Sequence, residues 1–297
     1  MQHLRFLHYV DAVARSGSIR GAAETLHVAA SAVNRRIQDL EEELGTPIFE
    51  RLPRGVRLTA AGELFLGYAR RRSADLEQVR SQIEDLRGVR RGRITLVASQ
   101  ALAPSFLPRA LVDFQATHPG ITFDVKVLDR ERAVQAVAEF QADLALVFNP
   151  PDLRGLRVLA QARQRTCAIV APDHPLAGRS SVRLKDCLQY PLALPDGSLS
   201  GRSVLDDLFE RSSARPQALL VSNSYELMRT FARVAGGIHF QIEIGGGGAA
   251  GVVAIPIDER NLPAGRLVLV ALRGRVLPVA AAAFAEFVAA RLNQTRD

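Results

Sequence analysis

The stretch SGSIRGAAETLHVAASAVNRRIQDLEEELGTPIFER, residues 16–51, decides the fold of the first domain. It predicts two helices joined by a short turn around residues 27–29, after an earlier helix that ends near residue 15. Ser18 is a suitable cap for the first of the two, because its hydroxyl can accept a hydrogen bond from a backbone N–H of the first turn. The second runs from about Ala30 to Leu44 and stops at Gly45.

The helix over residues 30–44 has two chemically different faces. On a wheel of about 100° per residue, its apolar stripe consists of Val33, Ile37, Leu40 and Leu44. The opposite face carries hydrogen-bonding side chains, namely Ser31, Asn34, Arg35 and Gln38. These groups suit base edges and phosphates, and DNA-reading helices usually enter the major groove by their N-terminal half. Every surface helix has a polar face, so this face alone does not establish DNA contact.

A basic hairpin is expected directly after this helix. Residues 49–51 and 56–58 flank Pro53-Arg54-Gly55, a pattern typical of a short β-hairpin. Its basic side chains are Arg51, Arg54 and Arg57, placed where a wing can reach the DNA backbone or the minor groove. Two helices, a turn and a basic wing in this order predict a winged helix-turn-helix DNA-binding domain over residues 1–59.

A long helix follows over residues 60–87, with Thr59 as its cap. Its apolar stripe consists of Leu64, Tyr68, Leu76, Val79, Ile83 and Leu86. A stripe on such a long helix needs a partner helix, which a second copy or another part of this chain can supply. We favour a linker helix that pairs two copies. Residues 88–92, GVRRG, are expected to form a hinge.

Residues 93–297 are expected to form an α/β domain of two lobes. Strands near residues 94–99, 122–128 and 144–148 alternate with helices, which indicates a parallel sheet covered on both faces. A second cycle starts near residue 166. We therefore assign about 93–162 and 272–297 to the first lobe and about 163–271 to the second. Four consecutive glycines, residues 245–248, predict a loop that is either mobile or locally rearranged.

Small ligands bind between such lobes, at the carboxyl ends of strands and the starts of helices. This rule selects Ser99, Gln100, Ala101 and Asn149 in the first lobe, and Ser198, Leu199, Ser200 and Ser224 in the second. Free N–H groups at a helix start can hold a carboxylate, so an organic acid is one effector class that suits these positions, and the chemistry of the effector stays open. Each Ser or Asn here is equally consistent with a helix cap.

Bulk properties agree with a soluble, DNA-binding protein. The chain has 297 residues, 47% of them hydrophobic, and a net charge of +7, which favours an acidic partner. No leader or membrane-spanning run is expected, which predicts a cytoplasmic protein. No catalytic, metal or dinucleotide motif is recognisable, so neither an enzyme nor a cofactor is expected. A redox sensor using Cys167 and Cys187 is the alternative, although buried, inert thiols are favoured.

The stretch quoted first and RGVRLTAAGELFL, residues 54–66, resemble the LysR-type transcriptional regulators. GRITLVAS (residues 92–99) and FLPRALVDFQATHPGITFDV (residues 106–125) resemble the effector domain of that family, so the resemblance covers the whole chain. It implies two lobes like those of periplasmic binding proteins, with a small-molecule effector between them. It also implies dimers or tetramers on imperfect palindromes of double-stranded DNA near promoters.

The resemblance also suggests which side chains read DNA. It makes Ser31, Asn34 and Arg35 the main contacts. Ala29 and Ala30 stand where many members carry Ser and Gln, so a base contact typical of the family is expected to be absent. Asn34 stands where Ser is common and could pair with adenine.

Overall fold

A computed structural model describes residues 3–86, 91–212, 215–248, 251–259 and 264–294. Most of the expected hinge, residues 88–90, lies outside the described residues. The chain divides into two compact units, one of residues 1–83 with 139–141 and one of the remaining residues. Among the described residues, no helix is both long and apolar enough to cross a membrane.

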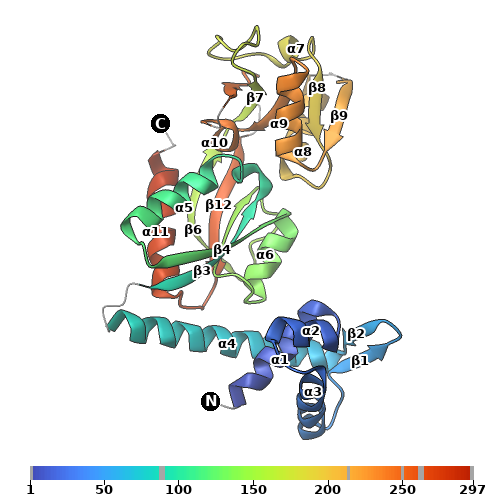
Figure 1. Cartoon of the computed structure of the whole chain (residues 1–297). Coiled ribbons are helices and arrows are strands. Elements are labelled where there is room, and N and C mark those ends of the chain that lie inside the picture. The colour runs from blue at the N-terminus through green and yellow to red at the C-terminus, as the bar shows by residue number, and fades with distance from the viewer. Residues whose placement is uncertain (1–2, 87–90, 213–214, 249–250, 260–263, 295–297) are drawn as a thin grey trace. The chain divides into compact units, whose positions relative to one another are not determined.

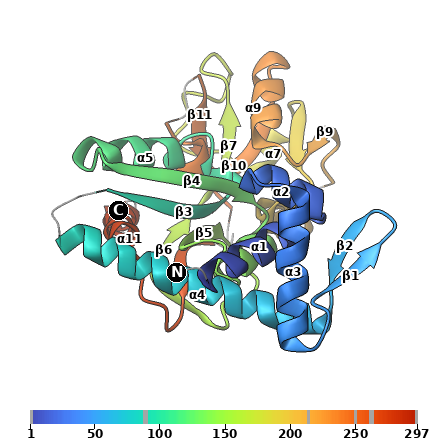
Figure 2. The same cartoon turned by 60° about the horizontal axis from the view of Figure 1, so that its bottom comes forward.

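The first unit consists of helices and one hairpin (Figures 1 and 2). In chain order its elements are α1 (His3–Ser16), α2 (Ile19–Leu26), α3 (Ala30–Leu44), β1 (Phe49–Leu52), β2 (Gly55–Leu58) and α4 (Ala60–Leu86). Val10 and Val13 of α1 pack with Val33 and Ile37 of α3 in one apolar core. The predicted stripe of α3 is wrong at Leu44, which lies in the last helical turn and is 42% exposed.

Local hydrogen bonds explain where these helices begin and end. The Ser18 hydroxyl accepts from the Gly21 N–H at 3.0 Å, and the Thr59 hydroxyl accepts from the Gly62 N–H at 3.0 Å. Gly45 takes the left-handed conformation that ends α3, with φ of 67°. These capping predictions are therefore confirmed.

The tip of the hairpin rests on the turn between α1 and α2. The Val56 N–H donates to the Gly17 carbonyl at 2.8 Å. Gly55 has a φ of 102°, and a Cβ atom there would lie 2.3 Å from the Gly17 carbonyl oxygen. Only glycine therefore allows this approach, which fixes the start of β2 against the helical core.

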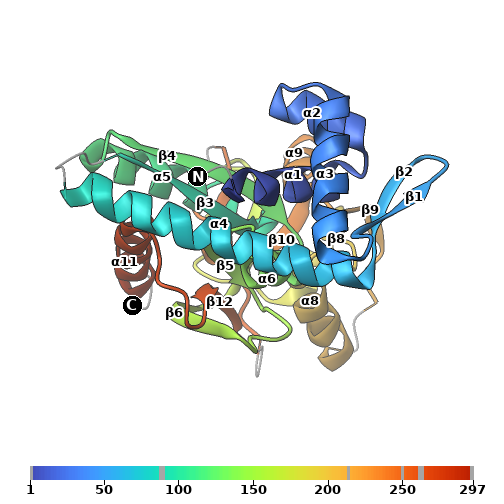
Figure 3. The same cartoon turned by 90° about the horizontal axis from the view of Figure 1, so that it is seen from below.

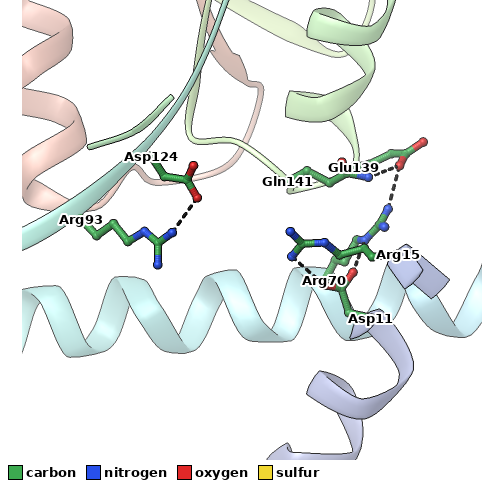
Figure 4. A network of polar contacts seen from close by, with 7 residues as sticks. All are labelled: Asp11, Arg15, Arg70, Arg93, Asp124, Glu139 and Gln141. Atoms are coloured by element: carbon green, nitrogen blue, oxygen red, sulfur yellow. Dashed lines mark hydrogen bonds and ion pairs between the residues drawn. The ribbon is translucent and has the colours of Figure 1, made fainter. Parts of the chain in front are cut away.

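Helix α4 is continuous over 27 residues (Figure 3). Its Arg70 side chain, only 11% exposed, donates from Nε to the Asp11 carboxylate of α1 at 2.8 Å, which anchors α4 to the helical core (Figure 4). Most of the predicted apolar stripe is exposed in the single chain, as the exposures of Leu64, Tyr68, Val79 and Ile83 range from 45% to 80%.

Lobe I of the second unit is a five-stranded sheet with helices on both faces (Figure 1). Its elements are β3 (Gly92–Ser99), the short helix η1 (Gln100–Leu102), α5 (Phe106–Thr117), β4 (Ile121–Leu128), α6 (Arg130–Ala138), β5 (Leu144–Phe148), β6 (Leu156–Gln164), β12 (Gly265–Leu272) and α11 (Val279–Gln294). The strand order is β4-β3-β5-β12-β6. Strand β3 is parallel to β4 and β5, as predicted, whereas β12 is antiparallel to β5 and β6.

The two faces of the lobe I sheet follow from alternation along its strands. Leu144, Leu146 and Phe148 of β5 pack in the core that includes residues of α5 and α11. Ala145 and Val147 point to the opposite face and pack with residues of α6. The arrangement leaves the carboxyl ends of β3 and β5 at one edge of the sheet.

Lobe II contains a second five-stranded sheet of order β11-β7-β10-β8-β9. Its elements are β7 (Thr166–Val170), α7 (Leu184–Cys187), β8 (Leu192–Pro195), α8 (Ser200–Arg211), β9 (Ala218–Ser222), α9 (Tyr225–Val234), β10 (Ile238–Ile242), α10 (Glu243–Gly246) and β11 (Val253–Pro256). The expected lobe boundaries need correction, because β6 reaches Gln164 and β12 resumes lobe I at Gly265 rather than at residue 272.

The four-glycine segment also differs from its prediction. Gly245 and Gly246 are buried in α10 instead of lying in a loop. A Cβ atom on Gly245 would lie 2.1 Å from the Ala101 carbonyl oxygen, and one on Gly246 would lie 2.3 Å from the Ile169 side chain. Gly245 therefore permits close packing between the lobes and Gly246 permits close packing of α10 on β7 within lobe II, requirements that composition alone does not reveal.

Candidate nucleic-acid interface and effector junction

Helix α3 exposes one polar face and buries the other. Val33, Ile37 and Leu40 are at most 6% exposed, which fixes the rotation of the helix. The side chains predicted to read DNA then face outward: Ser31, Arg35 and Gln38 are exposed, and Asn34 is half-buried. The structure therefore brings the four together on one face, as base or phosphate contact requires.

The start of α3 is suited to an anion. Ala29 occupies the N-cap position without a side-chain capping bond. Its carbonyl accepts from the N–H groups of Ala32 and Val33, whereas those of Ala30 and Ser31 have no acceptor among the described residues. Unpaired N–H groups and the helix dipole both favour a phosphate at this end.

A carboxylate of α3 fixes the position of the hairpin relative to that helix. Glu41 Oε1 accepts from the Ile48 N–H at 2.8 Å and from the Phe49 N–H at 3.0 Å. Nearer the start of α3, a guanidinium N–H of Arg51 donates to Asn34 Oδ1 at 2.8 Å. The predicted site residues Asn34 and Arg51 thus contact each other, and Glu41 is a supporting residue that the sequence did not identify.

The other two hairpin arginines differ in their partners. Arg57 donates to the Glu50 carboxylate at 2.7 Å, and this hydrogen bond raises the pKa of its guanidinium. Arg54 lies at the exposed tip, and no carboxylate of the described residues lies within ion-pair distance of it. The charge of Arg54 is consequently better placed for a phosphate than that of Arg57.

The predicted effector residues of lobe I hold the domain together. The buried Ser99 hydroxyl accepts from the Phe148 N–H at 3.0 Å. Gln100 Oε1 accepts from the Tyr225 N–H at 2.9 Å, and the Ala101 carbonyl accepts from Gln241 Nε2 at 2.7 Å. The last two bonds join η1 of lobe I to α9 and β10 of lobe II.

Asn149 serves the lobe I sheet. It has a positive φ of 47°, and its Oδ1 accepts from the Arg266 N–H at 2.7 Å. Its own N–H donates to the Arg266 carbonyl at 2.8 Å, which ties the end of β5 to β12. Its amide oxygen is therefore already engaged.

The predicted residues of lobe II also have local roles. The Ser198 hydroxyl donates to Asp196 Oδ1 at 2.6 Å, and the Ser224 hydroxyl caps α9 by accepting from the Leu227 N–H at 3.2 Å. Leu199 is 9% exposed within the core cluster that both lobes share, and Ser200 begins α8. The capping alternative is thus observed at Ser224, and effector contact at all eight positions remains a prediction.

A cavity of about 530 Å³ opens at the junction of the lobes. Its charged lining comprises Arg109, Arg165, Glu243 and Arg291, and Phe106 and Ile244 supply apolar surface. Arg165 pairs with Glu243 at 3.1 Å and Arg291 with Asp113 at 2.5 Å, whereas Arg109 donates to the Gly248 carbonyl. A ligand site between the lobes was expected, but none of the eight positions predicted for the effector lines this cavity, because its lining comes from segments far apart in the chain.

Comparisons with known proteins match both parts of the chain. The family model of the LysR substrate binding domain matches residues 87–293, and that of the bacterial regulatory helix-turn-helix protein of the lysR family matches residues 4–63. The chain belongs to the LysR family of transcriptional regulators. This regulator is 32% identical to the RuBisCO operon transcriptional regulator of Allochromatium vinosum, over 98% of this chain and 97% of that protein.

Solved structures of LysR-type regulators share this fold. Full-length CbnR complexed with its target DNA matches with a TM-score of 0.65 and 21% identity, over 97% of this chain and 99% of that one. The effector binding domain of QuiR in complex with shikimate matches with a TM-score of 0.55 and 21% identity, over 69% of this chain and 98% of that one. The predicted winged helix-turn-helix and two-lobed effector domain are therefore confirmed.

The cysteines of this LysR-type regulator do not support the redox alternative. Cys167 and Cys187 are both fully buried. Burial raises the pKa of each thiol to about 12, so both are protonated and poorly nucleophilic at neutral pH. Among the described residues, no group of His, Cys, Asp and Glu side chains is arranged to hold a metal ion.

Proposed function

We propose that this LysR-type regulator acts in the cytoplasm by inserting α3 of two copies into the major grooves of an imperfect palindrome near a promoter. The observation that carries this proposal is the outward polar face of α3, with Ser31, Asn34 and Arg35 held by a buried apolar stripe. A two-fold dimer presents two such helices, so it recognises two related half-sites.

Self-association is supported by apolar surface that the single chain leaves exposed. The stripe of α4 includes Val79 and Ile83, which are 48% and 45% exposed. A second helix of the same kind would bury this stripe. Lobe II adds Leu219 and Val221 on its edge strand β9, with exposures of 66% and 55%, and these residues suit further assembly to a tetramer.

The effector of this regulator is a small organic acid that acts at the lobe junction. Arginines line the cavity there, and Phe106 and Ile244 can contact an apolar portion of the ligand. The Gln100–Tyr225 and Ala101–Gln241 hydrogen bonds join the same two lobes. A ligand bound at this junction changes the equilibrium between two conformations of the regulator. The size of that change is set by the difference between the ligand's affinities for the two conformations.

The experiment is a footprint of the purified full-length protein on the DNA upstream of its own gene, with a scrambled fragment of equal length as control. We expect two protected half-sites about one helical turn apart or a multiple of it, and affinity that falls steeply with salt. Equal binding to the scrambled fragment would contradict sequence-specific regulation. Repeating the footprint with a panel of organic acids then tests the effector class.

A further inference from the structure

The hydrogen bond between Arg51 and Asn34 joins the wing to the face that is proposed to read DNA. A guanidinium N–H donates to Asn34 Oδ1 at 2.8 Å, across 17 positions of sequence. Asn34 is half-buried and Arg51 is exposed, so the pair lies at the rim of this face. Asn34 is therefore oriented by the hairpin before any DNA arrives.

The register of the hairpin accounts for this contact. Asn34 and Glu41 are seven residues apart, which places them on the same side of α3 and about 10 Å apart along it. At the C-terminal end of this stretch of about 10 Å along α3, the Glu41 carboxylate accepts hydrogen bonds from the backbone N–H groups of Ile48 and Phe49. From Phe49 to Arg51 the strand advances about 7 Å, and the long arginine side chain spans the remaining distance to Asn34. The pairing thus follows from how β1 is attached to α3.

The chemistry of the pair restricts what Asn34 can offer to a base. An asparagine amide has an accepting oxygen and a donating NH₂ group, whereas arginine only donates. Arg51 can consequently hold only the oxygen, so Oδ1 is directed to the hairpin, and Nδ2 has no hydrogen-bond acceptor among the described residues. Pairing with adenine in the major groove needs both ends of the amide, because Oδ1 accepts from adenine N6 while Nδ2 donates to N7.

We propose that Arg51 is a positioning residue that makes Asn34 a hydrogen-bond donor, so that the operator carries a keto base, guanine or thymine, where Asn34 reads it. Guanine and thymine present oxygen acceptors in the major groove, whereas adenine places an amino donor beside its N7 acceptor and cytosine presents only an amino donor, so a side chain that only donates gains least from these two. This revises the adenine pairing suggested by the sequence. The inference rests on the proposed function, since it requires α3 to enter a major groove.

The test is selection of binding sites from a library of random double-stranded DNA by the full-length protein. The wild type is compared with Asn34→Ala, Arg51→Met and their double variant. Arg54→Met is the matched control, because it removes an exposed arginine of the same hairpin that has no hydrogen bond or ion pair with α3 among the described residues. Circular dichroism and thermal unfolding confirm that each variant is folded.

We expect the wild type to favour guanine or thymine at one position of each half-site by about tenfold, and Asn34→Ala to abolish that preference. Arg51→Met should shift the same position toward adenine, and the double variant should match Asn34→Ala. Arg54→Met should weaken binding to all sequences alike and reduce the salt slope by about one.

Three results would overturn the inference: a preference for adenine in the wild type at the position that depends on Asn34, no such position, or an Arg51→Met variant with the unchanged preference. In the last case Arg51 contacts only phosphate. Failure of the proposed function gives a different result, because then the wild type enriches no sequence at all, and the inference falls with it.

Discussion

Among the acidic residues of α3, Glu41 is the one whose replacement should destabilise the hairpin most, because its carboxylate binds the hairpin backbone. Its carboxylate accepts the backbone N–H groups of Ile48 and Phe49 at 2.8 and 3.0 Å, and both bonds are partly buried. Leaving a buried donor unpaired costs about 1–3 kcal/mol. Water can reach these partly buried groups, so we take the lower limit for each of the two. Glu41→Ala should then lower the free energy of opening the hairpin by about 2 kcal/mol.

The assay is hydrogen exchange of the full-length protein, followed by mass spectrometry of peptides that cover residues 46–58. A change of about 2 kcal/mol corresponds to exchange about 30-fold faster, if the amides exchange through local opening. Glu43→Ala is the matched control, since Glu43 is an exposed residue of the same helix. Equal exchange in the two variants would refute the argument that Glu41 anchors β1 to α3.

The remaining predictions concern self-association, acid stability and the thiols. Ile83→Asp should shift the protein toward monomers in analytical ultracentrifugation, because it puts a charge into the apolar stripe of α4; an unchanged profile would reject this interface. Burial lowers the pKa of His239 to about 3, so the neutral ring contributes stability above pH 6.5 that is lost as the pH falls toward 3. Between pH 7 and pH 5 this loss should be about 2 kcal/mol, and thermal unfolding of His239→Leu should lack that part of the pH dependence. Mild peroxide should leave Cys167 and Cys187 unmodified in the folded protein, and mass spectrometry that detects a sulfenic acid on either would restore the redox alternative.

The sequence predicts those parts of the fold that depend on neighbours along the chain. The period of Val33, Ile37 and Leu40 indicates the buried side of α3, and Ser18 and Thr59 mark helix starts by hydrogen bonds within one turn. The exposed position of Leu44 is harder to predict, because a wheel gives a residue's direction but not whether the core extends that far.

Contacts between distant segments could not be predicted in the same way. The pairing of Asn34 with Arg51 depends on how the hairpin is attached to α3, and the role of Gly245 depends on the approach of Ala101 from the other lobe. The position of β12 in lobe I depends on antiparallel pairing with β5 and β6, although at least 100 residues separate β12 from either strand along the chain. Local pattern carries no information on such approaches.

In the proposed function, α3 buries one face so that the other can read bases. Comparison of Arg35→Ala with Arg36→Ala tests it most directly, because the neighbouring Arg36 lies over the Phe6 ring and pairs with Asp39 at 3.5 Å. The measurement is the ratio of affinities for the footprinted operator and for scrambled DNA at one fixed salt concentration. Loss of one base contact of about 1–3 kcal/mol predicts that Arg35→Ala lowers this ratio by roughly 5-fold to 150-fold, while Arg36→Ala leaves it nearly unchanged. Equal ratios for the two variants, or a loss confined to Arg36→Ala, would contradict the proposed orientation of α3 on DNA.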